Sequence, residues 1–260
     1  MLNTRFRGGA SSGACPIPSA CFRWLPTEWA SPLASWMQTL PERGLPDQWR
    51  TSLVTPLWKK KGEATDPTMY RPISVLHPMA KLFSLLMLDR LSTAAEHSQP
   101  PWRAVEQAGF RPRHRLEDHQ LPMTYLLQAA AAGRGSLAVA FIDLEKAYDR
   151  VPRLLLWEVL ARELGVPTDL LSGIRAMYHD CTAQVRTPGG LSPQFPTQVG
   201  VKQGCPASPV LFSLFFDRVV DFLQDNAPLH LRSATPLLAG LGTFVLLYAD
   251  DLVLLAAGAS

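Results

Sequence analysis

The stretch FVLLYADDLVLLA, residues 244–256, places two adjacent carboxylates, Asp250 and Asp251, inside an otherwise apolar run. The pattern is typical of a strand, a tight turn and a second strand. A buried carboxylate without a partner costs several kcal/mol, so two of them side by side point to a compensating positive charge. Aspartate is also common in turns, and the pair alone does not separate these two interpretations.

A third carboxylate, Asp143, ends the run SLAVAFID (136–143), which is apolar and has the length of a strand. If this strand neighbours the 244–256 hairpin, all three carboxylates converge on one edge of a sheet. Mg²⁺ prefers oxygen ligands and keeps waters and substrate phosphates in its shell. Two such ions about 3.5–4 Å apart serve phosphoryl transfer. Such an edge would suit two Mg²⁺ ions, or Mn²⁺, whereas an ordinary hairpin turn remains the alternative for Asp250 and Asp251.

Hydrophobic periodicity predicts the elements around these carboxylates. Helices are expected within residues 28–50 and over 79–91, 117–133, 153–164, 169–180 and 208–225. Strands are expected from residue 52 into the basic turn ending at 62, over 136–143, and in a hairpin over 182–200 that bends at Pro-Gly-Gly.

Composition bounds the class of protein. The chain has 260 residues, of which 47% are hydrophobic and 18% charged, so it can build one large core or two smaller ones and is not a disordered polyelectrolyte. Residues 1–142 contain 16 Lys and Arg against 10 Asp and Glu, whereas residues 143–260 contain 9 against 12. A basic first part suits a polyanionic partner and an acidic second part suits cations; the alternative is an uneven solvated surface.

Cysteine spacing and hydropathy indicate which cellular compartment the chain is expected to occupy. The four cysteines form no C-x-x-C pair and no zinc-ligand pattern with histidine, which favours free thiols in a reducing compartment. Asp250 and Asp251 interrupt the longest apolar segment, so neither a transmembrane helix nor contact with a membrane is expected. We expect an intracellular chain, with nucleus or cytoplasm left open. Residues 1–27 are expected to be a disordered leader, with a transit peptide as the alternative.

Three segments carry a resemblance to a known family. FIDLEKAYDRVPR, GVKQGCPASPVLFSLFFDRVVDFL and LLYADDLVLLA, in that order, resemble core motifs of reverse transcriptases, most closely those of non-LTR (LINE-type) retrotransposons. PDQWRTSLVTPLWKKKGEATDPTMYRPISVLHPMAKLFSLLMLDRL resembles the fingers region of that branch, and EQAGFRPRHRLEDH its next block. The resemblance runs from about Leu45 to Ala257.

The resemblance implies an RNA-directed DNA polymerase that adds dNTPs to the 3′-hydroxyl of a DNA primer on an RNA template by two-metal phosphoryl transfer. It implies an α+β fold: a right-hand polymerase palm, whose antiparallel sheet is backed by helices, with a mixed α/β fingers subdomain. Residues 28–135 would be fingers-like, and residues 136–260 a palm-like region truncated before the thumb. Two alternatives are open, a catalytically silent truncated remnant that only binds nucleic acid, and an RNA-templated RNA polymerase.

The resemblance also assigns roles to residues. It implies that Asp143, Asp250 and Asp251 are the catalytic and metal-binding carboxylates, and that the backbone carbonyl of Leu144 joins them as a ligand. An aromatic ring at Tyr148 would lie under the incoming sugar and clash with a 2′-hydroxyl. The other nucleotide-binding candidates are Arg71, Lys61, Gln203 and Gly204, and the nucleic-acid-binding candidates are Lys59, Lys60, Arg111 and Arg113.

Three of these assignments have open alternatives. Tyr148 would also be explained as an ordinary core aromatic residue. The lysines at 59–61 would also be explained as ordinary solvated charges. The block that contains Arg111 departs from the family, because Arg113, Arg115 and Leu116 stand where Gly, Ser and Thr are common. Template contact by this block is therefore left open.

Overall fold

The computed structural model describes residues 13, 15–18, 21, 24, 26–228 and 244–257. The chain divides into two compact units, each built from two segments. Unit 1 comprises Met1–Thr93 and Tyr148–Ser208, and unit 2 comprises Ala94–Ala147 and Pro209–Ser260. The domain boundaries expected at residues 27 and 135 stay predictions, and most of the expected leader lies outside the described residues.

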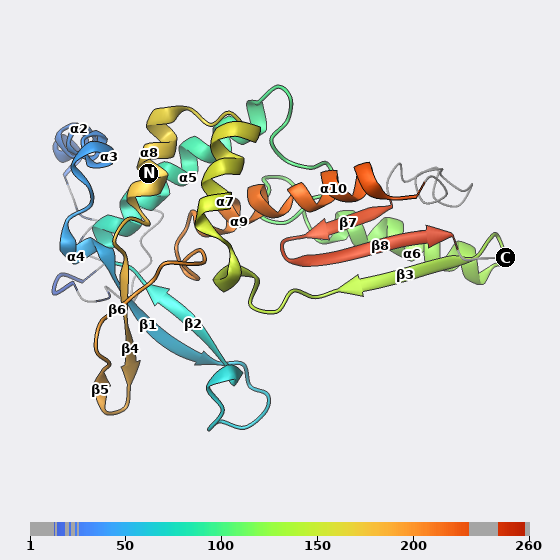
Figure 1. The fold of residues 1–260 in the computed structure, drawn as a ribbon, viewed down its shortest axis with the longest axis horizontal. Coiled ribbons are helices and arrows are strands. Elements are labelled where there is room, and N and C mark those ends of the chain that lie inside the picture. The colour runs from blue at the N-terminus through green and yellow to red at the C-terminus, as the bar shows by residue number, and fades with distance from the viewer. Residues whose placement is uncertain are drawn as a thin grey trace. The chain divides into compact units, whose positions relative to one another are not determined.

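Unit 1 contains a mixed sheet with strand order β2-β1-β4-β5, and β6 also pairs with β4 (Figure 1). β1 runs parallel to β4 although the paired residues Thr51 and Thr182 are far apart in the sequence, and the other pairs are antiparallel. The hairpin predicted at Pro-Gly-Gly is confirmed, because β4 turns into β5 there. The strands are β1 Thr51–Trp58, β2 Tyr70–Val75, β4 Thr182–Thr187, β5 Gly190–Leu191 and β6 Phe195–Pro196.

Helices complete unit 1, and its fully buried side chains include Phe83 and Leu91 of α5, Leu156 of α7 and Ile174 of α8. The helix predicted over 153–164 is confirmed, with its second half wound as a π-helix. Two of these helices cross a boundary of the unit, because α5 continues past Thr93 and η4 begins at Ala147. The helices are η2 Thr27–Trp29, α2 Ala30–Gln38, α3 Leu40–Arg43, α4 Asp47–Arg50, η3 Pro67–Met69, α5 Pro78–His97, η4 Ala147–Arg150, α7 Arg153–Glu158, η5 Val159–Glu163 and α8 Thr168–Ala176.

Unit 2 is built on a three-stranded antiparallel sheet with strand order β3-β8-β7 (Figure 1). Side chains alternate between the two faces of a strand, and both faces here are apolar. On one face Leu126 of α6 packs with Leu246 and Leu255. On the other face Val220 of α10 packs with Val245 and Leu247. The elements are α6 Glu117–Ala131, β3 Leu137–Ile142, α9 Ser208–Phe216, α10 Arg218–Asn226, β7 Val245–Tyr248 and β8 Asp251–Ala257.

The single long helix predicted over 208–225 is wrong, because the segment forms α9 and α10 with Asp217 between them. The Asp217 side chain is fully buried and accepts hydrogen bonds from the Ala104 backbone (3.2 Å) and the Gln107 amide (3.1 Å). The Val220 N–H bonds to the Asp217 carbonyl, three residues back, so the helix tightens at this point.

Among the residues that the structure describes, no helix combines the length and the apolar character that crossing a bilayer requires.

Candidate active site

The β3-β8-β7 sheet brings three carboxylates of unit 2 to one edge. β3 pairs with β8 up to Ile142 opposite Leu252, so the next residues along this register are Asp143 and Asp251. In the β7–β8 hairpin Tyr248 pairs with Asp251, and Ala249 and Asp250 form the two-residue loop. The prediction that the Asp143 strand neighbours the hairpin is confirmed.

The charges of these carboxylates act on one another. The pKa of Asp251 is raised by burial and then by the negative charges of Asp250 and Asp143. Asp143 and Asp251 are nevertheless exposed and Asp250 is half-buried, so a cation from solvent can reach the edge. A divalent cation would relieve the mutual repulsion and would find the oxygen donors that Mg²⁺ prefers.

The carboxylates do not by themselves form a closed metal cage. Within residues 26–228, 244–257 and the few described before them, no group of three or more His, Cys, Asp or Glu side chains is arranged to hold an ion. Mg²⁺ is usually bound through one or two carboxylates, with waters and substrate phosphates completing its shell. The donor set at the edge therefore fits a divalent cation that is shared with substrate.

In unit 1, the candidates Gln203 and Gly204 are fixed to strand β2, which also carries the exposed Arg71. The Ser74 N–H of β2 donates to the Gln203 carbonyl (2.7 Å). Gly204 has a φ of +112°, and a Cβ there would lie 2.5 Å from the Ser74 carbonyl oxygen. Only glycine fits this conformation and this approach without strain.

Tyr148 is joined to the same loop through its backbone. Its carbonyl accepts from the Val201 N–H (2.8 Å), and a Cβ at Gly200 would lie 2.8 Å from that carbonyl oxygen. The structure thus brings together Tyr148, Gln203 and Gly204. The Gln203 Oε1 is buried and has no hydrogen-bond partner among the described residues, so its capacity to accept a hydrogen bond is unmet in this arrangement.

Arg153 holds this loop and was not predicted from the sequence. It is 9% exposed, and its guanidinium donates to the carbonyls of Gly200 (2.9 Å) and Val199 (3.3 Å). Burial lowers its pKa, and the nearby Cys181 and Tyr178 oppose that shift. No local sequence pattern marks Arg153, because its burial and its carbonyl contacts arise from tertiary packing.

The basic candidates have different surroundings. Lys59 donates to the Thr68 carbonyl (2.9 Å), whereas Lys60, Lys61 and Arg71 are exposed. In unit 2, Arg111 pairs with Glu96 (3.4 Å) and donates to the Ala104 carbonyl (3.4 Å), while Arg113 is exposed. The charge of Arg111 is therefore partly neutralised within the unit.

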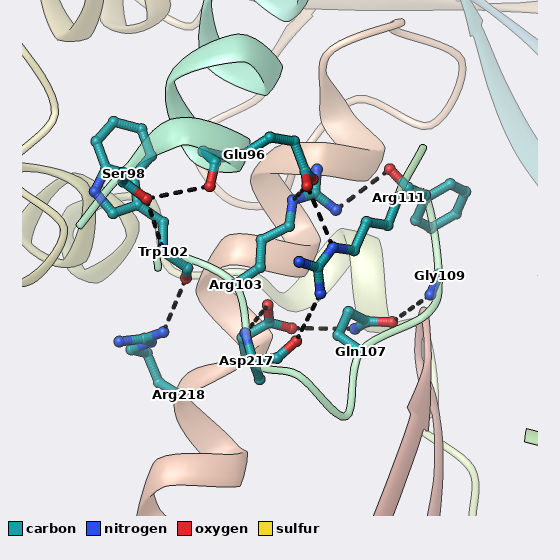
Figure 2. A network of polar contacts seen from close by, with 12 residues as sticks. Glu96, Ser98, Trp102, Arg103, Gln107, Gly109, Arg111, Asp217 and Arg218 are labelled. Carbon is teal, nitrogen blue, oxygen red and sulfur yellow. Dashed lines mark hydrogen bonds and ion pairs between the residues drawn. The ribbon is translucent and has the colours of Figure 1, made fainter. Parts of the chain in front are cut away.

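Asp217 lies in a polar network of unit 2 that also contains Gln107, Arg103 and Arg218 (Figure 2). Burial raises its pKa to about 6, although hydrogen bonds from Gln107 and Ala104 and the charges of Arg103 and Arg218 oppose the shift. No role for Asp217 was predicted. The signal was the same as for Asp250, a carboxylate that interrupts an apolar run.

The raised pKa of Asp217 predicts a pH-dependent stability. The folded chain binds this proton more tightly than the unfolded chain, whose carboxyl titrates near 3.8, so charging Asp217 opposes folding above pH 6. The difference in the free energy of unfolding, wild type minus Asp217→Asn, should therefore increase by about 1 kcal/mol when the pH is lowered from 7 to 5. Urea unfolding at each pH measures it. The exposed Asp47→Asn is the control, and a difference that does not vary with pH would contradict the assignment.

Comparisons with a protein-family profile and with curated proteins agree with one another. The profile of the family described as "Reverse transcriptase (RNA-dependent DNA polymerase)" matches residues 58–260. The chain is 28% identical over 193 residues to the "Retrovirus-related Pol polyprotein from type-2 retrotransposable element R2DM" of Drosophila melanogaster, covering 74% of this chain and 17% of that protein. It is 29% identical over 216 residues to the "Retrovirus-related Pol polyprotein from type-1 retrotransposable element R2" of Popillia japonica, covering 81% and 28%.

A third relative is the "RNA-directed DNA polymerase from mobile element jockey" of Drosophila melanogaster, 29% identical over 174 residues, which are 65% of this chain and 18% of that protein. The chain thus spans less than a third of the length of each of these relatives.

Among solved structures, apo telomerase from Candida tropicalis matches with a TM-score of 0.53 at 12% identity, over 89% of this chain and 44% of that one. Telomerase of the same organism in complex with a TWJ fragment of telomeric RNA also gives 0.53 at 12% identity, over 88% and 40%. At this identity the likeness concerns the fold alone, and it confirms the predicted α+β polymerase fold.

Proposed function

The chain belongs to the reverse transcriptase (RNA-dependent DNA polymerase) family, and from this premise we propose that it is an RNA-directed DNA polymerase region of a non-LTR retroelement. It would add dNTPs to a primer 3′-hydroxyl opposite an RNA template and release pyrophosphate. The observation that carries the proposal is the edge at which the strand register brings Asp143, Asp250 and Asp251 together.

The carboxylates would act through divalent ions. Asp143 and Asp250, with the backbone carbonyl of Leu144, would hold two Mg²⁺ ions, or Mn²⁺, and Asp251 would add the third negative charge. When bound, such ions lower the pKa of the attacking hydroxyl and neutralise charge on the leaving phosphates. The carboxylates supply the charge that attracts the ions and orient them through strand ends, which are fixed by the sheet.

The nucleotide would be bound by residues of unit 1. The exposed guanidinium of Arg71 suits triphosphate oxygens, which it can bind through paired hydrogen bonds, and Lys61 would add charge. The Gln203 side chain would hydrogen-bond the sugar, and Gly204 allows close approach of the backbone. The residues proposed to contact the template or primer backbone are Lys59, Lys60, Arg111 and Arg113.

Tyr148 is proposed to exclude ribonucleotides, because its ring would clash with the 2′-hydroxyl of the sugar. Tyr148→Val should therefore lower the preference for dNTPs over NTPs by at least about tenfold, equivalent to about 1.4 kcal/mol. Competitive incorporation of dNTP and NTP on one primer measures the ratio. Tyr125→Val, at an exposed position of α6, is the matched control, and an unchanged ratio in Tyr148→Val would rule out this role.

Primer extension by the full chain on an RNA template, with Mg²⁺ or Mn²⁺, tests the proposed function. Template-dependent addition of dNTPs is the expected result. Salt-dependent binding of RNA without any incorporation would overturn the proposal and favour a nucleic-acid-binding protein that lacks catalysis. Faster incorporation of NTPs than of dNTPs would instead indicate an RNA polymerase.

A further inference from the structure

We propose that Gln107, held by the buried carboxylate of Asp217, is a positioning residue that fixes the Ala249–Asp250 loop. Its importance for catalysis rests on the proposed function of Asp250. Gln107 lies within unit 2, and 142 positions separate it from Ala249 in the sequence. Within the part of the chain that the structure describes, its side-chain hydrogen bonds go to Asp217, Gly109 and Ala249 and to none of the three carboxylates, so it would act through the loop backbone.

The loop needs support because its backbone is strained. Ala249 has a φ of +59°, in the left-handed region that alanine rarely occupies. A residue with a side chain is disfavoured there by about 1–2 kcal/mol. Two-residue hairpin loops use positive φ and usually place glycine, asparagine or aspartate there. Such strain persists only where surrounding contacts hold the conformation.

Gln107 supplies these contacts with its side-chain amide. Its Oε1 accepts from the N–H of Ala249 (2.9 Å) and from the N–H of Gly109 (2.7 Å). Its Nε2 donates to Asp217 Oδ1 (3.1 Å) and, at a longer distance, to the Ala249 carbonyl (3.4 Å). The side chain is fully buried, so both polar groups of Ala249 bond to one amide from which water is excluded.

Asp217 determines which way this amide faces. A charged carboxylate only accepts hydrogen bonds, so the Gln107 NH₂ must point to it and the Gln107 oxygen must point to the loop. The Ala104 N–H donates to the second oxygen of Asp217 (3.2 Å), and the charges of Arg103 and Arg218 favour the carboxylate (Figure 2). Asp217 thus orients the amide, and the amide orients the loop.

Backbone contacts bring Gln107 to the loop. The Leu247 N–H donates to the Glu106 carbonyl (3.0 Å) and the Ala108 N–H donates to the Leu247 carbonyl (2.9 Å), so this segment lies parallel to β7. A Cβ at Gly109 would lie 2.2 Å from the Ala249 nitrogen. Glycine is therefore required at 109 for the segment to approach the loop this closely.

A charge exchange between the two side chains tests the proposal. Gln107→Glu keeps an oxygen that can accept from the Ala249 N–H, but it places a second carboxylate beside Asp217. In the double variant Gln107→Glu/Asp217→Asn, the asparagine amide can donate to the new glutamate, so the hydrogen bond between the two side chains is restored in the opposite direction. In Gln107→Glu we expect the Ala249 amide proton to exchange at least about tenfold faster, because repulsion from Asp217 would move the new carboxylate away from the loop. We also expect kcat for dNTP addition to fall by about 10- to 100-fold with KM nearly unchanged. The double variant should recover part of both losses.

Two controls separate positioning from general destabilisation. Gln128→Glu makes the same chemical change at an exposed position of α6 and should alter neither readout. Leu126→Ala removes buried volume where α6 packs on the same sheet, and it should lower stability without a selective increase in exchange at Ala249. The proposal is overturned if exchange at Ala249 is unchanged in Gln107→Glu, if kcat stays at the wild-type level, or if the double variant is no better than the weaker single variant. If the wild-type chain incorporates no dNTP, the proposed function fails, and the exchange measurement alone still decides whether Gln107 holds the loop.

Discussion

Asp250→Asn is expected to reduce template-dependent dNTP addition by at least about 1000-fold, equivalent to about 4 kcal/mol of transition-state stabilisation. Asparagine has nearly the same shape but no charge, so it would bind a divalent ion weakly. Single-turnover primer extension in Mg²⁺ measures the loss. The effect should exceed those of Gly204→Ala and Gln107→Glu, because the proposed chemistry depends on the ions that Asp250 would hold.

Stability measurements distinguish this loss from unfolding. The charge of Asp250 raises the pKa of the neighbouring Asp251, which reflects repulsion between them, so its removal should leave the melting temperature unchanged or slightly higher. Asp47→Asn removes one charge from a side chain that is 93% exposed and should incorporate dNTPs like the wild type. Near-normal synthesis by Asp250→Asn would remove this residue from the proposed site.

The carboxylate edge could be predicted because it follows from local pattern. Apolar runs of strand length predicted β3, β7 and β8, and a carboxylate at the end or bend of each run predicted where the charges would lie. Once two strands pair antiparallel, the register places the end of one beside the start of the other. The antiparallel pairing of β3 with β8 is therefore enough to place Asp143 beside Asp251.

Contacts between distant segments could not be predicted in the same way. The parallel pairing of Thr51 with Thr182 and the bond from Gln107 to Ala249 depend on tertiary packing, which no local period encodes. The break at Asp217 has the same origin, since a buried partner overrode the helical pattern of 208–225. The apolar run of β3 does not predict burial either, because Phe141 is 75% exposed.

Gly204→Ala is expected to have the second-largest effect, lowering kcat/KM for dNTP by at least about 100-fold, mainly through KM. The new Cβ would lie 2.5 Å from the backbone carbonyl oxygen of Ser74, far inside contact distance. The loop could relieve this clash only by moving away from β2, which would break the bond between the Ser74 N–H and the Gln203 carbonyl. Displacement of Gln203 would then remove the proposed sugar contact. Steady-state incorporation kinetics and thermal unfolding measure the two consequences.

Gly190→Ala provides the matched control, because it separates backbone strain from the clash. Gly190 has a φ of +119°, close to the +112° of Gly204, but a Cβ there would meet no atom within 4 Å. It should therefore show only the strain of alanine at positive φ, about 1–2 kcal/mol of stability, with KM for dNTP unchanged. Gly204→Ala should lose more stability than this and also bind dNTP poorly. Equal stability losses in the two variants, with KM unaffected in both, would mean that the approach of residue 204 to Ser74 has no part in nucleotide binding.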